Sequence, residues 1–207
     1  MALVNHAKME INAKIVYFGP PGSGKSTALE YIFSRIKPSL RGKIKNVPVG
    51  GDKLLFFDFS PFDRPPNDAY RLRLHVYTLT GPVTNQATWK MTLKGADGIM
   101  IMVDASRERF SEVQESIARL RGFLTAYGVR LDDTSALLQL NRFEREQLVM
   151  DVEHLVSGVD LKGLPFCYSR ADRGEGLLEA LTTLSRFVLG RLAEKGMKWQ
   201  ARVTRDA

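Results

Sequence analysis

A short run near the N-terminus has the residue types and spacing of a phosphate-binding loop. It matches the pattern G-x-x-x-x-G-K-S, and a threonine comes directly after it. Glycines allow backbone N–H groups to curl around an anion, and a helix that begins at the loop directs its positive end toward the same place. We expect all of these residues to contact a nucleotide: Gly19, Pro20, Pro21, Gly22, Ser23, Gly24, Lys25, Ser26 and Thr27.

Two side chains of this loop are predicted to perform its chemistry. The Lys25 ammonium can reach the β- and γ-phosphates of a nucleotide, and we predict it to be catalytic as well as binding. The Ser26 hydroxyl is the predicted ligand of an accompanying Mg²⁺ ion. A flexible Gly/Pro turn before a helix is the alternative reading, but it requires the complete pattern to occur by chance in that context.

The sequence around the loop predicts the elements that position it. The apolar run 13–18 is typical of a strand, and Leu29, Ile32, Phe33 and Ile36 form one apolar stripe of a helix. Further strands are expected over 54–59, 72–78, 98–103, 136–140 and 165–168, and further helices over 109–127, 144–156 and 175–193.

The connection between the expected strands 54–59 and 72–78 contains Pro61, Pro65 and Pro66. It is too short and too rich in proline for a crossover helix, so these two strands are predicted to form an antiparallel hairpin. The element order then predicts an α/β fold of the P-loop NTPase class, with helices on both faces of a six-stranded, mostly parallel sheet that has one antiparallel strand. The nucleotide is expected at the carboxyl edge of the sheet.

Composition restricts the class of protein. With 207 residues, 44% hydrophobic and 26% charged, the chain is typical of one globular domain, predicted over 1–195 and followed by a basic tail over 196–207. The single cysteine, Cys167, and the lack of an apolar run long enough to span a membrane favour the cytoplasm. The net charge of +7 favours acidic partners, but no nucleic-acid recognition motif accompanies it. The tail is either a solvated end or a peripheral contact with phospholipid.

Four segments are similar to a known family: Glu10 to Pro20, Leu55 to Phe59, Leu74 to Thr78 and Leu93 to Gly98. With the phosphate-binding loop first, the chain resembles the Ras-like small GTPases, and within them the bacterial MglA-type group. The resemblance implies a Ras-like G-domain that alternates between GTP and GDP with Mg²⁺ and governs cell polarity or gliding motility. It also implies a Roadblock/LC7-type (MglB-like) partner that stimulates hydrolysis, and it leaves the downstream effector unidentified.

Several residues depart from the family pattern around the expected γ-phosphate. Pro21 replaces a glycine, so one backbone donor is missing and the proline ring is expected close to that phosphate. The threonine of the first switch has no clear counterpart in the stretch 49–53. Lys53 stands where MglA-type proteins commonly carry an arginine thought to assist hydrolysis. We predict Lys53 to be catalytic but weaker, because lysine lacks the planar fork of arginine.

The second switch reads Thr78-Leu79-Thr80-Gly81-Pro82. Thr78 in place of the usual aspartate agrees with the MglA-type group, and Gly81 is predicted to contact the nucleotide. Pro82 occupies the place of the glutamine that orients the attacking water, and its side chain can neither donate nor accept a hydrogen bond. Gln86 is either a substitute for that glutamine or a plain exposed polar residue.

The base-recognition motif, Asn-Lys-x-Asp in most of these enzymes, corresponds to Asn141-Arg142-Phe143-Glu144. The resemblance implies that Asn141 bridges to the phosphate-binding loop, that the Arg142 stem stacks on the base, and that Glu144 accepts from guanine N1 and N2. Glu144 is one methylene longer than aspartate, so guanine and adenine both stay open, as does a simple helix start. The predicted backbone support of the base is Ser169, Arg170 and Ala171.

Two functional hypotheses follow from the match and its departures. The first is a slow GTPase switch, and the second is a pseudo-GTPase that recruits a partner and no longer hydrolyses its nucleotide. An ATP-dependent kinase fits the loop but fits the expected hairpin and the MglA-like segments poorly. Asp58 is open between an Mg²⁺ contact and an ion pair.

Overall fold

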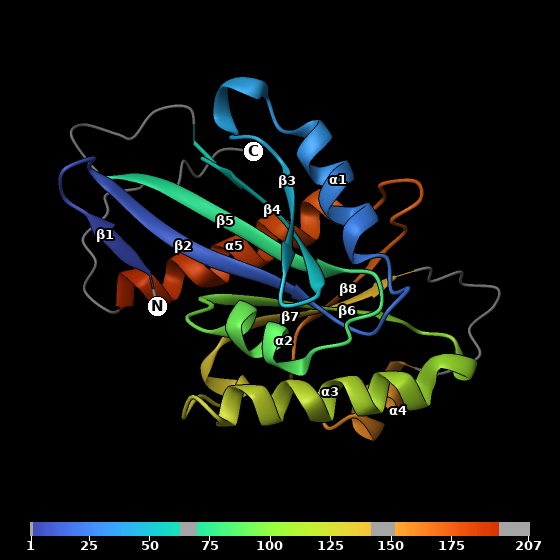
Figure 1. Cartoon of the computed structure of the whole chain (residues 1–207). Coiled ribbons are helices and arrows are strands. Elements are labelled where there is room, and N and C mark those ends of the chain that lie inside the picture. The colour runs from blue at the N-terminus through green and yellow to red at the C-terminus, as the bar shows by residue number, and fades with distance from the viewer. Residues whose placement is uncertain (1, 63–69, 142–151, 195–207) are drawn as a thin grey trace.

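The computed structural model describes residues 2–62, 70–141 and 152–194. Within them the chain forms one eight-stranded sheet and five α-helices (Figure 1). The strands are β1 (Leu3–Asn5), β2 (Glu10–Phe18), β3 (Lys45–Val49), β4 (Asp52–Phe59), β5 (Arg71–Thr80), β6 (Gly98–Asp104), β7 (Ser135–Asn141) and β8 (Phe166–Ser169). The helices are α1 (Lys25–Arg35), α2 (Gln86–Leu93), α3 (Phe110–Thr125), α4 (Val152–Gly158) and α5 (Leu177–Glu194).

The sheet order is β3-β4-β5-β2-β6-β7-β8, and β1 pairs with the beginning of β2. Strands β5, β2, β6, β7 and β8 run parallel to their neighbours in this series, whereas β4 is antiparallel to both β3 and β5. Asp104, Asn141 and Ser169 lie side by side in register at the ends of β6, β7 and β8. The segments that follow the parallel strands therefore meet at one edge of the sheet.

The structure confirms the expected α/β class, the mostly parallel sheet, the helices on both faces and the β4–β5 hairpin. It corrects the number of strands from six to eight and the number of reversed strands from one to two, β1 and β4. The additional strands are β1 and β3. β1 has only three residues, and β3 is an edge strand that contains Pro48, so neither produces a strong strand pattern.

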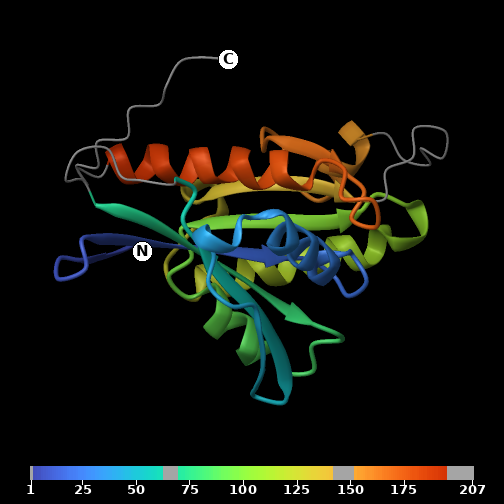
Figure 2. The ribbon, with the colours of Figure 1, turned by 90° about the horizontal axis from the view of Figure 1, so that it is seen from above.

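Two helical layers cover the sheet. Helices α1 and α5 pack on one face with Leu29, Ile32 and Leu184, and helices α2, α3 and α4 pack on the other with Trp89, Leu120 and Leu155 (Figure 1). Because both faces are covered, β6 and β7 are buried along their whole length. Figure 2 shows the twist of the sheet, with the β3–β4 hairpin turned away from β7 and β8.

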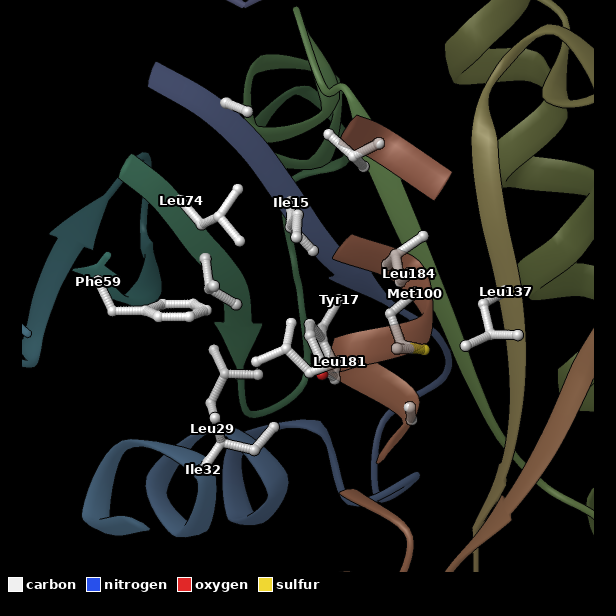
Figure 3. Close-up of a cluster of buried hydrophobic side chains, with 14 of the residues drawn as sticks. Ile15, Tyr17, Leu29, Ile32, Phe59, Leu74, Met100, Leu137, Leu181 and Leu184 are labelled. Carbon is white, nitrogen blue, oxygen red and sulfur yellow. The ribbon is translucent and has the colours of Figure 1, made fainter. Parts of the chain in front are cut away.

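The core beneath α1 and α5 holds the strand that carries the phosphate-binding loop. Ile15 and Tyr17 of β2 are fully buried between Leu74 of β5 and Met100 of β6, and Leu181 of α5 packs over them (Figure 3). Each such side chain stabilises the fold by about 1.5–3 kcal/mol relative to an exposed one. The strand end that leads into Gly19 is therefore held rigidly from both sides.

Two expected segments fall partly outside the described residues. The helix expected over 144–156 is described only from Val152, and the tail expected over 196–207 is not described. Among the described helices, none has the length and apolar character needed to cross a membrane.

Candidate functional site

Loops from five strands gather at the carboxyl edge of the sheet. The run from Gly19 follows β2, Gly81 follows β5, and Arg109 lies shortly after β6. A cavity of about 410 Å³ opens at this edge, and its walls include Pro21, Lys25, Gly81 and Arg109. The predicted phosphate-binding loop and the second-switch glycine therefore face one cavity.

The glycines of the loop are required by its close contacts. A Cβ atom at Gly19 would lie 2.0 Å from the carbonyl oxygen of Met102. Gly24 has a φ of 94° in the left-handed region, and a Cβ there would lie 2.4 Å from Nδ2 of Asn141. The backbone thus curls tightly at both ends, as a loop that presents its N–H groups to an anion must. This geometry fits a phosphate group.

Lys25 begins α1 and its side chain is buried over the loop. Its Nζ donates to the carbonyl of Pro20 at 2.7 Å and to Oγ of Ser23 at 3.3 Å. Burial, together with the nearby Arg109 guanidinium, lowers the pKa of Lys25 from 10.5 to about 8. A negatively charged ligand at this place would favour the charged ammonium, which is consistent with a phosphate partner.

Ser26 and Thr27 follow Lys25 in the first turn of α1. Among the described residues there is no cluster of three His, Cys, Asp or Glu side chains that could hold a metal ion. Mg²⁺ commonly takes only one or two protein ligands and completes its shell with phosphate oxygens and water. The hydroxyl of Ser26 beside a phosphate loop fits that kind of site.

Asn141 joins the loop to the neighbouring strand ends. Its Nδ2 donates to the carbonyl of Ser23 at 2.9 Å. Its Oδ1 accepts from the backbone N–H of Ala171 at 2.9 Å and faces the Ser169 hydroxyl at 3.5 Å. Asn141 is 1% exposed, so this junction is a buried amide that bonds through both its nitrogen and its oxygen. The bridge expected from the sequence is present, and it brings Ser169, Arg170 and Ala171 to the same edge.

Arg142 and Glu144, the predicted readers of the base, lie outside the described residues. Their roles stay predictions. Arg170, on the other side of the junction, has its backbone N–H bonded to the carbonyl of Glu175, which closes the turn after β8.

The residues of the second switch lie at the end of β5 and after it, beside the cavity. The Thr78 hydroxyl donates to the carbonyl of Tyr17 at 2.9 Å, so it ties β5 to β2 beneath the loop. Gly81 has a φ of 74° and lies in the cavity wall with Gln86. Pro82 is exposed next to it. Gln86 is exposed but faces the same cavity as Lys25, which keeps its substitute role open.

Lys53 and Asp58 lie at opposite ends of β4. Lys53 is exposed and pairs in register with Thr80, one residue before Gly81. Asp58 forms an ion pair with Arg73, whose Nε donates to Oδ2 at 2.6 Å. Asp58 thus has the ion pair that the sequence offered as one of its two alternatives.

The structure places two residues at this edge that the sequence did not predict to belong to the site, Arg109 and Asp52. Arg109 donates to the carbonyl of Pro21 at 2.6 Å. Asp52 begins β4 and accepts from the backbone N–H and the hydroxyl of Thr84, at 2.8 and 3.1 Å. The sequence offered one indication of Arg109, which is a basic residue shortly after an apolar run that predicts a buried strand. For Asp52 the only indication was its place after Gly50 and Gly51 in a turn.

Comparison with known proteins gives one clear similarity. No family model matches the chain. The chain is 32% identical over 196 residues to the "Mutual gliding-motility protein MglA" of Myxococcus xanthus (strain DK1622). The aligned region covers 95% of this chain and 100% of that protein. The similarity therefore extends through the loop, the switch segments and the remainder of the sheet.

Proposed function

We propose, because the chain belongs to the MglA-type family of Ras-like small GTPases, that it is a molecular switch which binds GTP and GDP. The observation that carries this proposal is the Asn141 side chain, which fastens Ser23 of the phosphate-binding loop to Ala171 after β8. A generic Gly/Pro turn needs no such junction. In a nucleotide site the same amide holds the phosphate half and the base half of the pocket in one fixed arrangement.

The residues of the loop divide the binding between them. The backbone N–H groups of Gly22 to Lys25 and the Lys25 ammonium hold the phosphates, and the helix α1 directs its positive end toward them. Ser26 is the residue that would hold Mg²⁺, which neutralises phosphate charge when bound. Ser169, Arg170 and Ala171 support the base, with Arg142 and Glu144 as its proposed readers and guanine as the proposed base.

Hydrolysis by the isolated chain is proposed to be slow. Pro82 has no hydrogen-bonding side chain to orient water, and Lys53 lacks a planar guanidinium. A Roadblock/LC7-type partner that adds or repositions a polar group at Gly81 and Gln86 would restore turnover. We propose that this regulated switch acts in cell polarity or gliding motility. Cys167 as the single cysteine supports a reducing, cytoplasmic location.

The test of nucleotide binding is a fluorescence titration of nucleotide-free protein with labelled GDP, GTP and ATP in Mg²⁺. We expect guanine nucleotides to bind more tightly than ATP. Lys25→Ala should weaken binding by about 100-fold or more, because it removes a charged phosphate contact. Lys8→Ala, which changes an exposed lysine in the turn between β1 and β2, is the matched control and should bind normally. Equal affinity for ATP contradicts the guanine proposal, and unchanged binding by Lys25→Ala contradicts the site.

A second candidate is a pseudo-GTPase that binds nucleotide only to stabilise an interaction surface. Pro21 and Pro82 favour it, since each removes a hydrogen-bonding group near the expected γ-phosphate. Single-turnover phosphate release with and without a Roadblock-type partner separates the two. Release that accelerates with the partner supports the switch, and no release under either condition supports the pseudo-GTPase.

A further inference from the structure

Arg109 contacts the phosphate-binding loop although the sequence did not predict it to belong to the site. It ends the short 3₁₀ turn Arg107–Arg109 between β6 and α3. It nevertheless contacts the phosphate-binding loop, 88 residues away in the sequence from Pro21. The same cavity touches Arg109, Lys25 and Gly81. Arg109 thus lies at the wall where the loop and the second switch face each other.

The guanidinium of Arg109 is fixed by contacts on two sides. Nη2 donates to the carbonyl of Pro21 at 2.6 Å and pairs with Oε2 of Glu112 at 2.6 Å. A Cβ atom at Gly22 would lie 2.9 Å from Nη1, so the guanidinium rests directly on that glycine. Among the described residues, Nε of Arg109 is buried without a hydrogen-bond partner. Two loop residues therefore have their outer side covered by this one side chain.

We propose that Arg109 is a positioning residue of the phosphate-binding loop and that its charge makes the site prefer the triphosphate over the diphosphate. The inference deepens the proposed function and rests on it. On this proposal Arg109 supplies the preference for a γ-phosphate, because Pro82 and the other substituted switch residues do not supply it.

The chemistry of Pro21 explains why the loop needs this residue. Proline has no N–H, so at Pro21 the backbone offers an anion no donor and has only a carbonyl for outside contacts. Arg109 takes that carbonyl in a charge-assisted hydrogen bond and brings a permanent positive charge to the same end of the loop. A triphosphate carries more negative charge than a diphosphate, so a fixed cation near its end stabilises the triphosphate more.

Glu112 sets the strength of this effect. Glu112 lies three residues after Arg109, in the first turn of α3, and its carboxylate pairs with Arg109. It therefore offsets part of the positive charge that the cavity experiences. Removal of the carboxylate should therefore increase the preference for GTP. A purely mechanical role of Arg109 makes a different prediction, because loss of its partner would then weaken the grip on both nucleotides or change nothing.

The experiment measures the dissociation constants of labelled GDP and of labelled GTPγS, a slowly hydrolysed triphosphate, for the full chain in Mg²⁺. The quantity compared is the ratio of the two constants. Arg109→Gln should shift this ratio toward GDP by about three- to tenfold. Glu112→Gln should shift it toward GTPγS. Arg109→Lys keeps the charge, so it should leave the ratio within about twofold of the wild type. Lysine lacks the planar fork of arginine, so the variant should weaken the binding of both nucleotides.

The matched control is Arg130→Gln, which removes an exposed arginine that pairs with Asp132 far from the cavity. It should leave both constants and their ratio unchanged. Thermal unfolding of each nucleotide-free variant identifies any that fail to fold. If Arg109→Gln does not fold, the opposite shift expected of Glu112→Gln still decides the question.

The outcomes separate this inference from the proposed function. If the wild type binds both nucleotides and neither Arg109→Gln nor Glu112→Gln changes the ratio, the inference about Arg109 is overturned while the switch stands. If both variants weaken GDP and GTPγS equally, Arg109 has only a mechanical role. If the wild type binds neither nucleotide, the proposed function fails, and the assignment of Arg109 fails with it.

Discussion

At the scale of the residue, the second switch presents the most consequential substitution. Pro82 follows Gly81, which lies in the cavity wall with Lys25, and both Pro82 and Gln86 are exposed. Because position 82 is exposed, a change of its side chain displaces no core residue. Proline at this position supplies no hydrogen-bonding side chain.

Pro82→Gln should raise the rate of GTP hydrolysis by the isolated protein by about tenfold or more, because the added amide can orient the attacking water. Single-turnover release of phosphate from bound GTP measures this rate. Pro82→Ala is the matched control, since it also removes the ring but adds no polar group. Equal rates for the two variants would show that the amide is not the missing component.

At the scale of the element, Asp52 joins the β3–β4 hairpin to the start of α2. Its carboxylate is buried and accepts from Thr84 and from the backbone N–H of Asn85. The Asn85 side chain donates in return to the carbonyl of Gly50 at 3.3 Å. The hairpin and the second switch are therefore tied at their tips, and movement of one should be transmitted to the other.

The pH dependence of stability should report this connection. Burial alone would raise the pKa of Asp52, but the hydrogen bonds from Thr84 and Asn85 outweigh it and hold the pKa below its ordinary value of 3.8. A carboxyl group with a depressed folded-state pKa contributes stability above its ordinary pKa and loses it as the pH falls through the folded value.

Asp52→Asn should therefore lower the free energy of unfolding by about 1–3 kcal/mol at pH 7, because an amide cannot replace the charged acceptor. The difference from the wild type should stay constant down to about pH 4 and shrink below it. Urea unfolding followed by circular dichroism across this range measures it. Asp132→Asn, an exposed acid paired with Arg130, serves as the control. A difference that persists unchanged below pH 3 would contradict the assignment.

At the scale of the whole molecule, the two helical layers hold the sheet rigid beneath the site. Leu184 of α5 is fully buried in the layer shared with β2, while Leu178 of the same helix is 38% exposed. A Cβ atom at Gly98 of β6 would lie 3.5 Å from Cδ1 of Leu184, so α5 rests closely on the strand. The position of the loop after β2 therefore depends on packing far from it.

Leu184→Ala should lower the free energy of unfolding by about 2–5 kcal/mol through lost burial and the cavity that remains. Leu178→Ala, the same change on the same helix, should cost less than about 1 kcal/mol, since its side chain is already partly in water. Urea unfolding measures both. Similar losses for the two variants would contradict the layer arrangement described for α5.

Local patterns in the sequence were sufficient for a large part of the fold and the candidate site. The loop from Gly19 to Ser26 and the strands β2, β4, β5, β6 and β7 were predictable, because glycine spacing and apolar runs act within a few residues. The strand β3 was not, because its five residues include Lys45, Asn46 and Pro48 and form an edge strand only when β4 lies beside them.

Contacts between distant segments were decided only by the tertiary structure. Arg109 and Pro21 are 88 residues apart, and Asp52 and Thr84 are 32 apart, so no local pattern links either pair. The same holds in part for Asn141 and Ser23, 118 residues apart, where the motif predicted the partner but not the hydrogen bonds to Ala171. Parallel strands bring their carboxyl ends together whatever their distance in the sequence. The identity of the loop is therefore a property of neighbouring residues, and the composition of the site is a property of the sheet order.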